Sequence, residues 1–507
     1  MIIDSHVHFP ASLDIPEKEW GKYLVDRAAR CGIDAVIVSD VFIRNSNDAG
    51  AYPDSAALRR ANGYAAGQAA LNPGRLYFLA YINPQEPDWQ READLAVADG
   101  AVGIKLWISL KDDSSSMAAT AEVLRYASRR NLPVLLHVFN RTEGNLKGEI
   151  NIAEFAELSR QVPECIMIAA HSGGNYHVSA GMYKRCSGNV YWDISGTDPD
   201  RSMVTELLKE VPAERLLFGS DAPGRSFVSQ LHKVTLARIP EPEKKLILGK
   251  NAQKLYKIHD IAQTPPSTID KTEPEINLCS EDHFLFCGKW PFSSAENITP
   301  KKLEHLLETN NIDRGFTVDL DSVFSIDLLY ANRKFRHQCR RYRRILPLAV
   351  VDPESANLEV LLDDAAEHND RGVWFSPALS SRMPDSTPVL KLCALCAERK
   401  LPLYMNCSLG EARFQHRALH IKRIFFNDLR NFFKVAPEHD YIFQGIVPEP
   451  DIPRHDCRFT FEKLTDSEQG ITNFINSGGS KEYLLPGSEF PFREINQTRL
   501  AAAGKIF

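Results

Sequence analysis

The sequence has no long apolar run and no large excess of charge of one sign. No stretch approaches the ~20 apolar residues that a helix needs to cross a bilayer, so we expect no membrane partner. The net charge is -6 at pH 7, which gives no reason to expect nucleic acid or another polyanion as a partner. The first apolar segment begins at Met1, which leaves no room for a secretion signal. We therefore expect a cytoplasmic protein.

Cysteine is sparse, and the ten cysteines are scattered over 507 residues. In a reducing compartment such cysteines are buried thiols rather than a disulfide framework. Cys393 and Cys396 form a CxxC in an apolar, helix-like segment. No second Cys/His pair accompanies them to complete a zinc site, so we interpret them as core residues. The basic segment 333–344 is interpreted as a solvated helix face and not as a nucleic-acid site.

The first half of the chain alternates short apolar runs with amphipathic segments. Residues 34–40 and 132–138 are typical of buried strands, whereas 20–32 and 119–131 have helical spacing. This alternation predicts βαβ units and a parallel sheet, hence an α/β fold. Eight units in about 250 residues fit a closed (β/α)8 barrel of the TIM type. A doubly wound open sheet normally has fewer strands and a glycine-rich first turn, which is absent here.

A break in this pattern divides the chain. Residues 262–275 are rich in Pro, Thr and charge, as is typical of a linker. A chain of 507 residues is also too long for one ordinary core. We predict a catalytic barrel over 1–260, a linker over 261–275 and a second barrel over 276–507.

The second half repeats segments of the first in the same order. A repeat of this length indicates a duplicated domain and not a solenoid, whose units are ~20–50 residues long. We predict two tandem (β/α)8 barrels, the second shorter and degenerate. The clearest matches are RLYFLAYINP (75–84) with RILPLAVVDP (344–353), RRNLPVLLHV (129–138) with ERKLPLYMNC (398–407), and LLFGSDAP (216–223) with LLPGSEFP (484–491).

Two histidines stand on alternate positions of the first predicted strand. Residues i and i+2 of a strand face the same side, so His6 and His8 can bind one transition metal. Alone, this pair also fits two imidazoles satisfied by hydrogen bonds. The carboxyl ends of barrel strands form the rim where active sites lie, and further polar residues occur at those ends. They are Lys105, His137, His171 and Asp221. Together these residues predict a metal site.

Other polar residues lie near the same rim. Asn83 and Asp193 each follow a strand, where they either bind substrate or cap a loop. Arg141 and Arg225 follow His137 and Asp221 into loops. Either arginine is a candidate clamp for a substrate carboxylate, although an exposed arginine without a role fits the pattern as well.

The segments that carry these residues are similar to the amidohydrolase superfamily. The stretches IIDSHVHF, GIKL, AHSGGN, YWDISG and LLFGSDAP resemble the amidohydrolase-2 branch, which includes aminocarboxymuconate-semialdehyde decarboxylase and related hydrolases. The likeness covers residues 1–258. It implies a divalent metal, with one zinc expected, that lowers the pKa of its water toward ~7. The implied ligands are His6, His8, His137 and Asp221, and Asp221 also accepts the proton of the water.

The resemblance leaves two residues with more than one role. His171 would polarise a substrate carbonyl, act as an acid or base, or bind a second metal. Lys105, whose ordinary pKa is near 10.4, is a metal ligand only if CO2 carbamylates it. A free Lys105 would instead neutralise an anionic substrate or orient Asp221.

The resemblance also implies the reaction. We expect a hydrolase that attacks an amide, lactone or ester of a small organic acid. The alternative is non-oxidative decarboxylation of an aromatic or unsaturated acid. A third interpretation, from a different class, is a barrel that binds a small molecule without catalysis.

The second half lacks the predicted ligands. Trp374, Asn406 and Glu489 stand opposite Lys105, His137 and Asp221, and the stretch HFLFC that starts at 283 has no paired histidines. No histidine matches His171 either. An asparagine and one carboxylate do not make a zinc site, so we predict that this half is catalytically inactive. We expect it to act as an intramolecular pseudo-dimer partner, with Arg493 as a side chain that it lends to the active site.

Overall fold

The chain forms two compact units, residues Met1–Lys271 and Thr272–Phe507. The structure, a computed structural model, describes residues 1–9, 16–41, 53–107, 113–141, 144–196, 203–225, 227–265, 280–292, 297–410, 419, 421–460, 474–475 and 477–489. Among the helices in these ranges, none has both the length and the apolarity needed to cross a bilayer.

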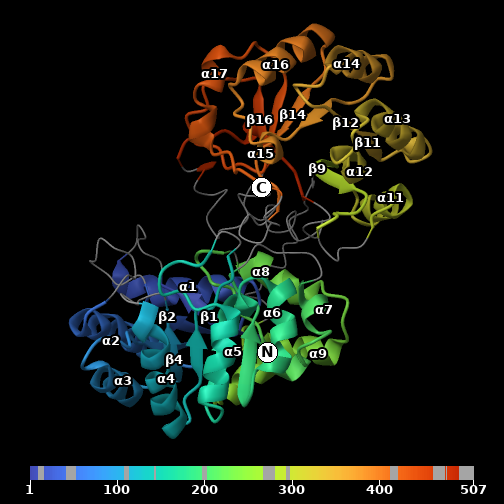
Figure 1. Cartoon of the computed structure of the whole chain (residues 1–507). Coiled ribbons are helices and arrows are strands. Elements are labelled where there is room, and N and C mark those ends of the chain that lie inside the picture. The colour runs from blue at the N-terminus through green and yellow to red at the C-terminus, as the bar shows by residue number, and fades with distance from the viewer. Residues whose placement is uncertain are drawn as a thin grey trace. The chain divides into compact units, whose positions relative to one another are not determined.

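The first unit is built around one parallel sheet of eight strands (Figure 1). The strands follow one another around the sheet in chain order, from β1 to β8, and every neighbouring pair is parallel. They are β1 (Ile3–His8), β2 (Ala35–Ser39), β3 (Leu76–Tyr81), β4 (Gly103–Leu106), β5 (Val134–Leu136), β6 (Ile166–Ala169), β7 (Asn189–Asp193) and β8 (Leu216–Leu217).

Hydrogen bonds bring the last strand back to the first. Ser5 N donates to Phe218 O at 3.0 Å, and Asp221 N donates to His6 O at 2.7 Å. The sheet is therefore a nearly closed barrel, and the prediction of a (β/α)8 barrel for the first half is confirmed.

Helices lie on the outside of this barrel, as the amphipathic segments predict. In α1 the buried residues Trp20, Leu24 and Ala28 recur every four positions and pack toward the strands. The helices of this unit are α1 (Trp20–Arg30), α2 (Ser55–Leu71), α3 (Trp89–Ala98), α4 (Asp113–Arg129), α5 (Ile152–Gln161), α6 (Tyr176–Met182), α7 (Met203–Leu207), α8 (Phe227–Thr235), α9 (Glu241–Lys245) and α10 (Asn251–Leu255).

The end of the barrel opposite the carboxyl ends of the strands is apolar. Ile3, Leu79 and Leu135 belong to a buried cluster that also contains Ala252 and Leu255 of α10. Apolar side chains from the strands thus pack against this C-terminal helix. The predicted linker begins immediately afterwards, but Thr264 is buried and its N–H donates to Asp34 at 2.8 Å. Residues 261–265 therefore belong to the first unit, while 266–275 lie outside the described residues.

Strand β1 contains one extra residue relative to β2. Asp4 pairs with Val36 and Val7 with Val38, so three steps in β1 match two in β2. Such β-bulges re-aim side chains and are frequent beside active sites. The buried Asp4 carboxylate holds this bulge, because its Oδ1 accepts hydrogen bonds from His6 N and Ser220 N at 3.2 and 2.9 Å.

A half-buried histidine outside the rim gives the first testable prediction. His232 lies on α8, its buried Nδ1 has no hydrogen-bond partner among the described residues, and burial lowers its pKa to about 4. The folded protein does not protonate His232 between pH 6.5 and 4, whereas the unfolded chain does. Its contribution to stability is therefore complete above pH 6.5 and is lost as the pH falls. Between pH 7 and pH 5, the free energy of unfolding should fall by about 2 kcal/mol more in the wild type than in His232→Leu. Urea unfolding at the two pH values measures both changes.

The control for this prediction is the exposed His259. His259→Leu should leave the pH dependence of stability unchanged. Equal slopes for wild type and His232→Leu would contradict the assignment.

The second unit contains parallel strands in two smaller sheets. Their orders are β11-β10-β9 and β12-β13-β14-β15-β16-β17. Leu348, between β11 and β12, donates to Thr317 O of β10 at 2.9 Å, and His283 N donates to Pro486 O at 2.8 Å. The strands are β9 (Glu281–Cys287), β10 (Arg314–Asp319), β11 (Ile345–Pro347), β12 (Ala349–Val350), β13 (Val373–Phe375), β14 (Leu403–Asn406), β15 (Tyr441–Gln444), β16 (Cys457–Thr460) and β17 (Leu484–Leu485).

The described helices of this unit include four of ten or more residues, each between two consecutive strands, and a shorter one, α15. Cys393 and Cys396 are fully buried in α16, which agrees with the interpretation of this CxxC as core. The basic segment lies on α13, where Arg336 pairs with Asp364 and Asp370. The helices named here are α11 (Pro300–Thr309), α13 (Leu328–Cys339), α14 (Leu358–Glu367), α15 (Pro377–Ser380) and α16 (Thr387–Arg399).

The bulge of β1 occurs again in β9. Asp282 pairs with Gly315 and Leu285 with Thr317, so three steps again match two. The Asp282 carboxylate accepts hydrogen bonds from Phe284 N at 3.0 Å and Ser488 N at 3.1 Å. This arrangement matches that of Asp4 in the first unit.

Candidate metal centre

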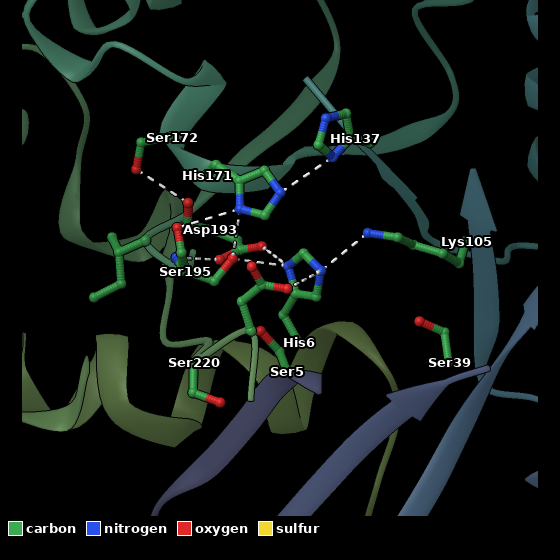
Figure 2. Close-up of polar contacts among 12 residues, drawn as sticks. Ser5, His6, Ser39, Lys105, His137, His171, Ser172, Asp193, Ser195 and Ser220 are labelled. Carbon is green, nitrogen blue, oxygen red and sulfur yellow. Dashed lines mark hydrogen bonds and ion pairs between the residues drawn. The ribbon is translucent and has the colours of Figure 1, made fainter. Parts of the chain in front are cut away.

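His6 lies between Asp193 and Ser195 on one side and Lys105 on the other (Figure 2). On one side, its Nδ1 lies 2.6 Å from Asp193 Oδ2 and 2.8 Å from Ser195 Oγ. On the other side, its Nε2 lies 3.2 Å from His8 Nε2 and 3.0 Å from Lys105 Nζ. Because the Asp193 carboxylate accepts the Nδ1 proton, Nε2 of neutral His6 carries a lone pair.

A hydrogen-bond partner of Nδ1 also orients the ring of His8. Its Nδ1 lies 3.0 Å from the carbonyl oxygen of Ser39 and 3.1 Å from Ser39 Oγ. The carbonyl can only accept, so it favours a proton on Nδ1 and a lone pair on Nε2. That Nε2 lies 3.2 Å from Oδ1 of Asp221. Asp221 follows β8 and has a φ of 65°, a left-handed conformation that Asp adopts more readily than most residues.

These contacts bring three acceptors together. The ligand atoms of His6, His8 and Asp221 lie within 4.8 Å of one another. Two imidazole lone pairs and a carboxylate oxygen repel one another unless a cation or a proton lies between them. Two nitrogens and one carboxylate oxygen are a donor set suited to a divalent transition metal. The residues present therefore fit a metal ion.

Burial controls the charges of this group. Burial and the nearby Lys105 ammonium lower the pKa of His6 to about 4, against the opposing effect of Asp193. Burial also lowers the pKa of Lys105 to about 8, although Asp221 and Asp193 raise it. Burial raises the pKa of Asp221, but the neighbouring histidines, with His8 Nε2 only 3.2 Å away, lower it by more, to well below its usual value. At neutral pH His6 is neutral and Asp221 is ionised.

His171 lies beside this group on an unusual loop. After β6 the chain has positive φ at four consecutive residues, with 56° at His171, 50° at Ser172, 71° at Gly173 and 87° at Gly174. A Cβ at Gly174 would lie 2.4 Å from the backbone nitrogen of Asn140, which explains why glycine is needed there. The loop turns the His171 ring back over the rim, 5.1 Å from the His6 ring.

His137 is the outermost of the predicted histidines. Its Nδ1 lies 3.2 Å from His171 Nε2, and its Nε2 lies 2.9 Å from Glu149 Oε1. Among the described residues, His137 and His171 are thus linked to the His6 group through ring contacts but are not part of the three-ligand cluster. Burial lowers the pKa of both histidines.

The predicted substrate residues have mainly structural contacts. Asn83 is buried and binds the loop atoms Pro53 O and Gln85 N. Asp193 is fully buried behind His6, and Arg225 donates to Gly224 O at 3.0 Å. Arg141 binds Glu149 through two nitrogens, at 2.7 and 3.0 Å.

Sequence reasoning missed three residues of this site. Ser195 has a detectable signal, because it lies two positions after Asp193 at a strand end. Glu149 has none, because it lies in a loop twelve positions from His137. Gly196 was also missed, and its φ is 74°.

Gly196 provides a second prediction. A Cβ at this position would lie 2.2 Å from His171 Nδ1 and 2.7 Å from Asp221 Oδ2. Gly196→Ala should therefore displace both side chains. Because a shift of about 1 Å in a site can cost ~100-fold in rate, we expect at least about that loss in steady-state turnover.

Gly100→Ala is the matched control. Gly100 also has a positive φ, 99°, but its Cβ would meet nothing within 4 Å. Both substitutions should cost ~1–2 kcal/mol of backbone strain, but Gly100→Ala should keep its activity. Equal activity losses in the two variants would contradict the proposed crowding.

Comparison with known sequences identifies the family. A sequence model described as amidohydrolase matches residues 3–258. The chain belongs to the amidohydrolase family. The resemblance stated from the motifs is thereby confirmed at the level of this family. No curated protein sequence matches this amidohydrolase.

Several solved structures are similar to half of this amidohydrolase. They include 2,6-dihydroxybenzoate decarboxylase from Rhizobium, with 19% identity, 50% of this chain and 98% of that chain covered, and a TM-score of 0.39. A dihydroxybenzoic acid decarboxylase from Polaromonas sp. JS666, with bound manganese and the inhibitor 2-nitroresorcinol, has 21% identity, 50% and 96% coverage, and a TM-score of 0.40. A 4-oxalomesaconate hydratase from Rhodopseudomonas palustris has 16% identity, 51% and 96% coverage, and a TM-score of 0.40.

Proposed function

We propose that the first unit is a metal-dependent hydrolase that cleaves an amide, lactone or ester bond in a small organic acid, with one zinc ion as its metal. The observation that carries this proposal is the convergence of two imidazole lone pairs and the Asp221 carboxylate within 4.8 Å. A divalent metal bound there would lower the pKa of water toward ~7 and so supply hydroxide at neutral pH.

The side chains around this cluster have distinct tasks in the proposed reaction. The Asp221 side chain is 25% exposed, whereas that of His6 is 1% exposed, so the ionised carboxylate can reach water and accept its proton. Asp193 and the Ser39 carbonyl fix the tautomers of His6 and His8. Lys105 lies 3.0 Å from His6 Nε2, where its free ammonium would attract an anionic substrate. A second metal would require carbamylation of Lys105.

One observation favours decarboxylation of an aromatic acid as a second candidate function. The His137 ring is flanked by two aromatic rings, Trp107 at 6.3 Å in an edge arrangement and Phe139 at 6.1 Å in a stacked one. Aromatic side chains provide flat apolar surface on which an aromatic substrate can stack. The same metal ligands support either reaction, so they do not distinguish the two.

Metal analysis followed by product analysis tests the proposal. The purified protein should contain about one divalent metal per chain, and a panel of amides, lactones, esters and aromatic carboxylic acids should reveal a substrate. A cleaved or ring-opened acid supports hydrolysis, whereas release of CO2 would replace it with decarboxylation. Protein that binds no divalent metal would instead favour a non-catalytic binding protein.

We further propose that the second unit is a degenerate copy of the same barrel. The β-bulge and its aspartate occur at Asp4 and at Asp282. Asp221 and Glu489 both have left-handed backbones, with φ of 65° and 57°. These shared irregularities support a common origin better than a shared helix–strand order does.

The residues at the predicted metal-binding and catalytic positions differ between the two copies. On this alignment Phe284 and Phe286 replace His6 and His8. Trp374 replaces Lys105 and donates to Gln444 Oε1 at 2.8 Å. Asn406 replaces His137 and binds Ser376 and Ser408. Hydrogen bonds within the unit occupy these polar groups, so we propose that it has no metal site.

The role of the second unit as an intramolecular partner is a separate prediction. A chain that ends at residue 271 should lose solubility or activity if the second unit acts as this partner. Size-exclusion chromatography and turnover measurements check this expectation, and a soluble, fully active fragment would refute it. Arg493, the predicted contributor to the active site, lies outside the described residues.

A further inference from the structure

Helix α8 has a lysine on its buried face. Phe227, Leu231 and Val234 follow one another at spacings of four and three residues and lie in the core of the first unit, as an amphipathic helix requires. Lys233 stands beside Val234 and is only 6% exposed. Lysine is rarely buried to this extent, and burial of its polar end is unfavourable unless a hydrogen bond compensates for it.

The partner of this lysine lies directly behind the candidate metal centre. Lys233 Nζ donates to the carbonyl oxygen of Ile194 at 2.9 Å. Ile194 is fully buried and stands between Asp193 and Ser195, just after β7. The side chains of these two neighbours lie 2.6 and 2.8 Å from Nδ1 of His6, the ring nitrogen that faces away from the three-ligand cluster. Lys233 therefore binds the peptide that carries both supports of His6.

Two other elements hold the same segment. Ile194 N donates to Leu217 O of β8 at 3.1 Å. Ser172 Oγ, after β6, donates to Asp193 O at 3.0 Å, a contact drawn in Figure 2. These bonds tie the segment to the neighbouring strands, whereas Lys233 ties it to a helix of the outer layer.

That helix is the one that follows Asp221 in the chain. Helix α8 begins at Phe227, six residues after Asp221. Lys233 thus connects the helix that follows one proposed metal ligand with the segment that supports another, His6. Residues behind the ligands orient them and thereby tune the affinity for the metal. A bond between the two supports should therefore favour metal binding.

We propose that Lys233 is a positioning residue of the metal site, which holds residues 193–195 against α8 and so keeps His6 and Asp221 in the arrangement that binds the metal. The inference rests on the proposed function, because it requires a divalent metal at this cluster. It concerns the supports of the ligands, so it applies equally to hydrolysis and to decarboxylation. A lysine with a purely structural role would instead stabilise the fold without affecting the metal.

Lys233→Met in the full-length protein tests this proposal, because methionine has a similar length and flexibility but no donor. Zn²⁺ should bind about 10-fold more weakly, as measured by competition with a chromophoric chelator. The variant saturated with Co²⁺ should also show a changed visible absorption spectrum, because this spectrum depends on the geometry of the metal ligands. A wild-type zinc affinity or a wild-type cobalt spectrum would overturn the proposal.

Lys244→Met is the matched control. Lys244 Nζ also donates to a backbone carbonyl at 2.9 Å, but its acceptor is Thr235 O, at the last residue of α8. The side chain is 14% exposed. This variant should keep the zinc affinity and the cobalt spectrum of the wild type even if it loses stability. Equal losses of affinity in the two variants would show that Lys233 only stabilises α8, and would refute the inference.

A measurement on the wild type decides the question if Lys233→Met does not fold. Coupling between two sites is reciprocal, so a contact that favours metal binding is itself favoured by the bound metal. Reductive methylation, followed by mass spectrometry, should modify Lys233 at least about threefold more slowly with Zn²⁺ bound than after treatment with a chelator. The rate at Lys244 should not change. Equal rates at Lys233 in the two states would contradict the proposal.

These experiments separate the inference from the proposed function. Wild-type protein that binds no divalent metal would contradict the proposed function and the inference together. Wild-type protein that binds zinc no more tightly than Lys233→Met does would contradict the inference alone. None of the measurements requires a substrate.

Discussion

Asp221→Asn is expected to fold normally and to lose about 10³-fold in turnover. The carboxamide has almost the same shape as the carboxylate, and Asn also tolerates the left-handed φ of 65° found at this position. The substitution nevertheless removes the ionised group that accepts a proton in the proposed reaction. Steady-state kinetics at saturating metal, with circular dichroism as a check of folding, measures the effect.

Asp34→Asn is the control for this prediction. Asp34 is also buried, and it accepts hydrogen bonds from Ile2 N and Thr264 N at 2.8 Å each. It contacts none of the site histidines in the described structure, so its substitution should change stability but not kcat. If Asp221→Asn keeps more than about a tenth of wild-type turnover, Asp221 does not act as the base.

Replacement of His6 by alanine should abolish metal retention. His6 contributes one of the three converging lone pairs, and we expect at least about 100-fold weaker binding of Zn²⁺. Metal at 100 times its Kd should stabilise the wild type by about 2.7 kcal/mol. The same metal concentration should shift the unfolding midpoint of His6→Ala much less. Competition with a chromophoric chelator gives the Kd, and thermal unfolding gives the stabilisation.

The variant His8→Ala tests the same prediction with less risk of misfolding. The loss of His6 leaves the buried Asp193 carboxylate without its imidazole partner, whereas His8 binds a backbone carbonyl through Nδ1. His8→Ala should therefore fold more reliably and show the same loss of metal. His259→Ala, at an exposed position, should behave like the wild type. Unchanged zinc affinity in His8→Ala would remove the basis for the metal site.

The residues on the rim of the first barrel could be predicted, because the apolar runs of the sequence show where each strand ends. In a parallel barrel the carboxyl ends of all strands meet at one rim, so the residue that ends each apolar run has a known place. His6, His8 and Asp221 meet as this rule requires. The alternation of strands and helices likewise predicts the barrel of the first unit.

The partners of these residues could not be predicted, because loops and buried hydrogen bonds have no period. Glu149 reaches His137 only through the path of its loop, which Asn145 and Asn151 fix. Asp193 was placed on the rim correctly by its strand, but the sequence does not say whether its carboxylate faces a substrate or a histidine. The structure places it 2.6 Å from His6.

The bulge shared by β1 and β9 serves the fold of each unit and does not depend on the residues of the proposed metal site. In each unit an aspartate, Asp4 or Asp282, holds two backbone N–H groups and lets the first strand bend. The aspartate makes these hydrogen bonds whether it is followed by histidines, as in β1, or by phenylalanines, as in β9. If the second unit is the degenerate copy that we propose, selection for shape has preserved the aspartate after selection for catalysis ended. A sequence search that gives weight to this aspartate would count both halves as enzymes, whereas one that requires the histidine pair would count one.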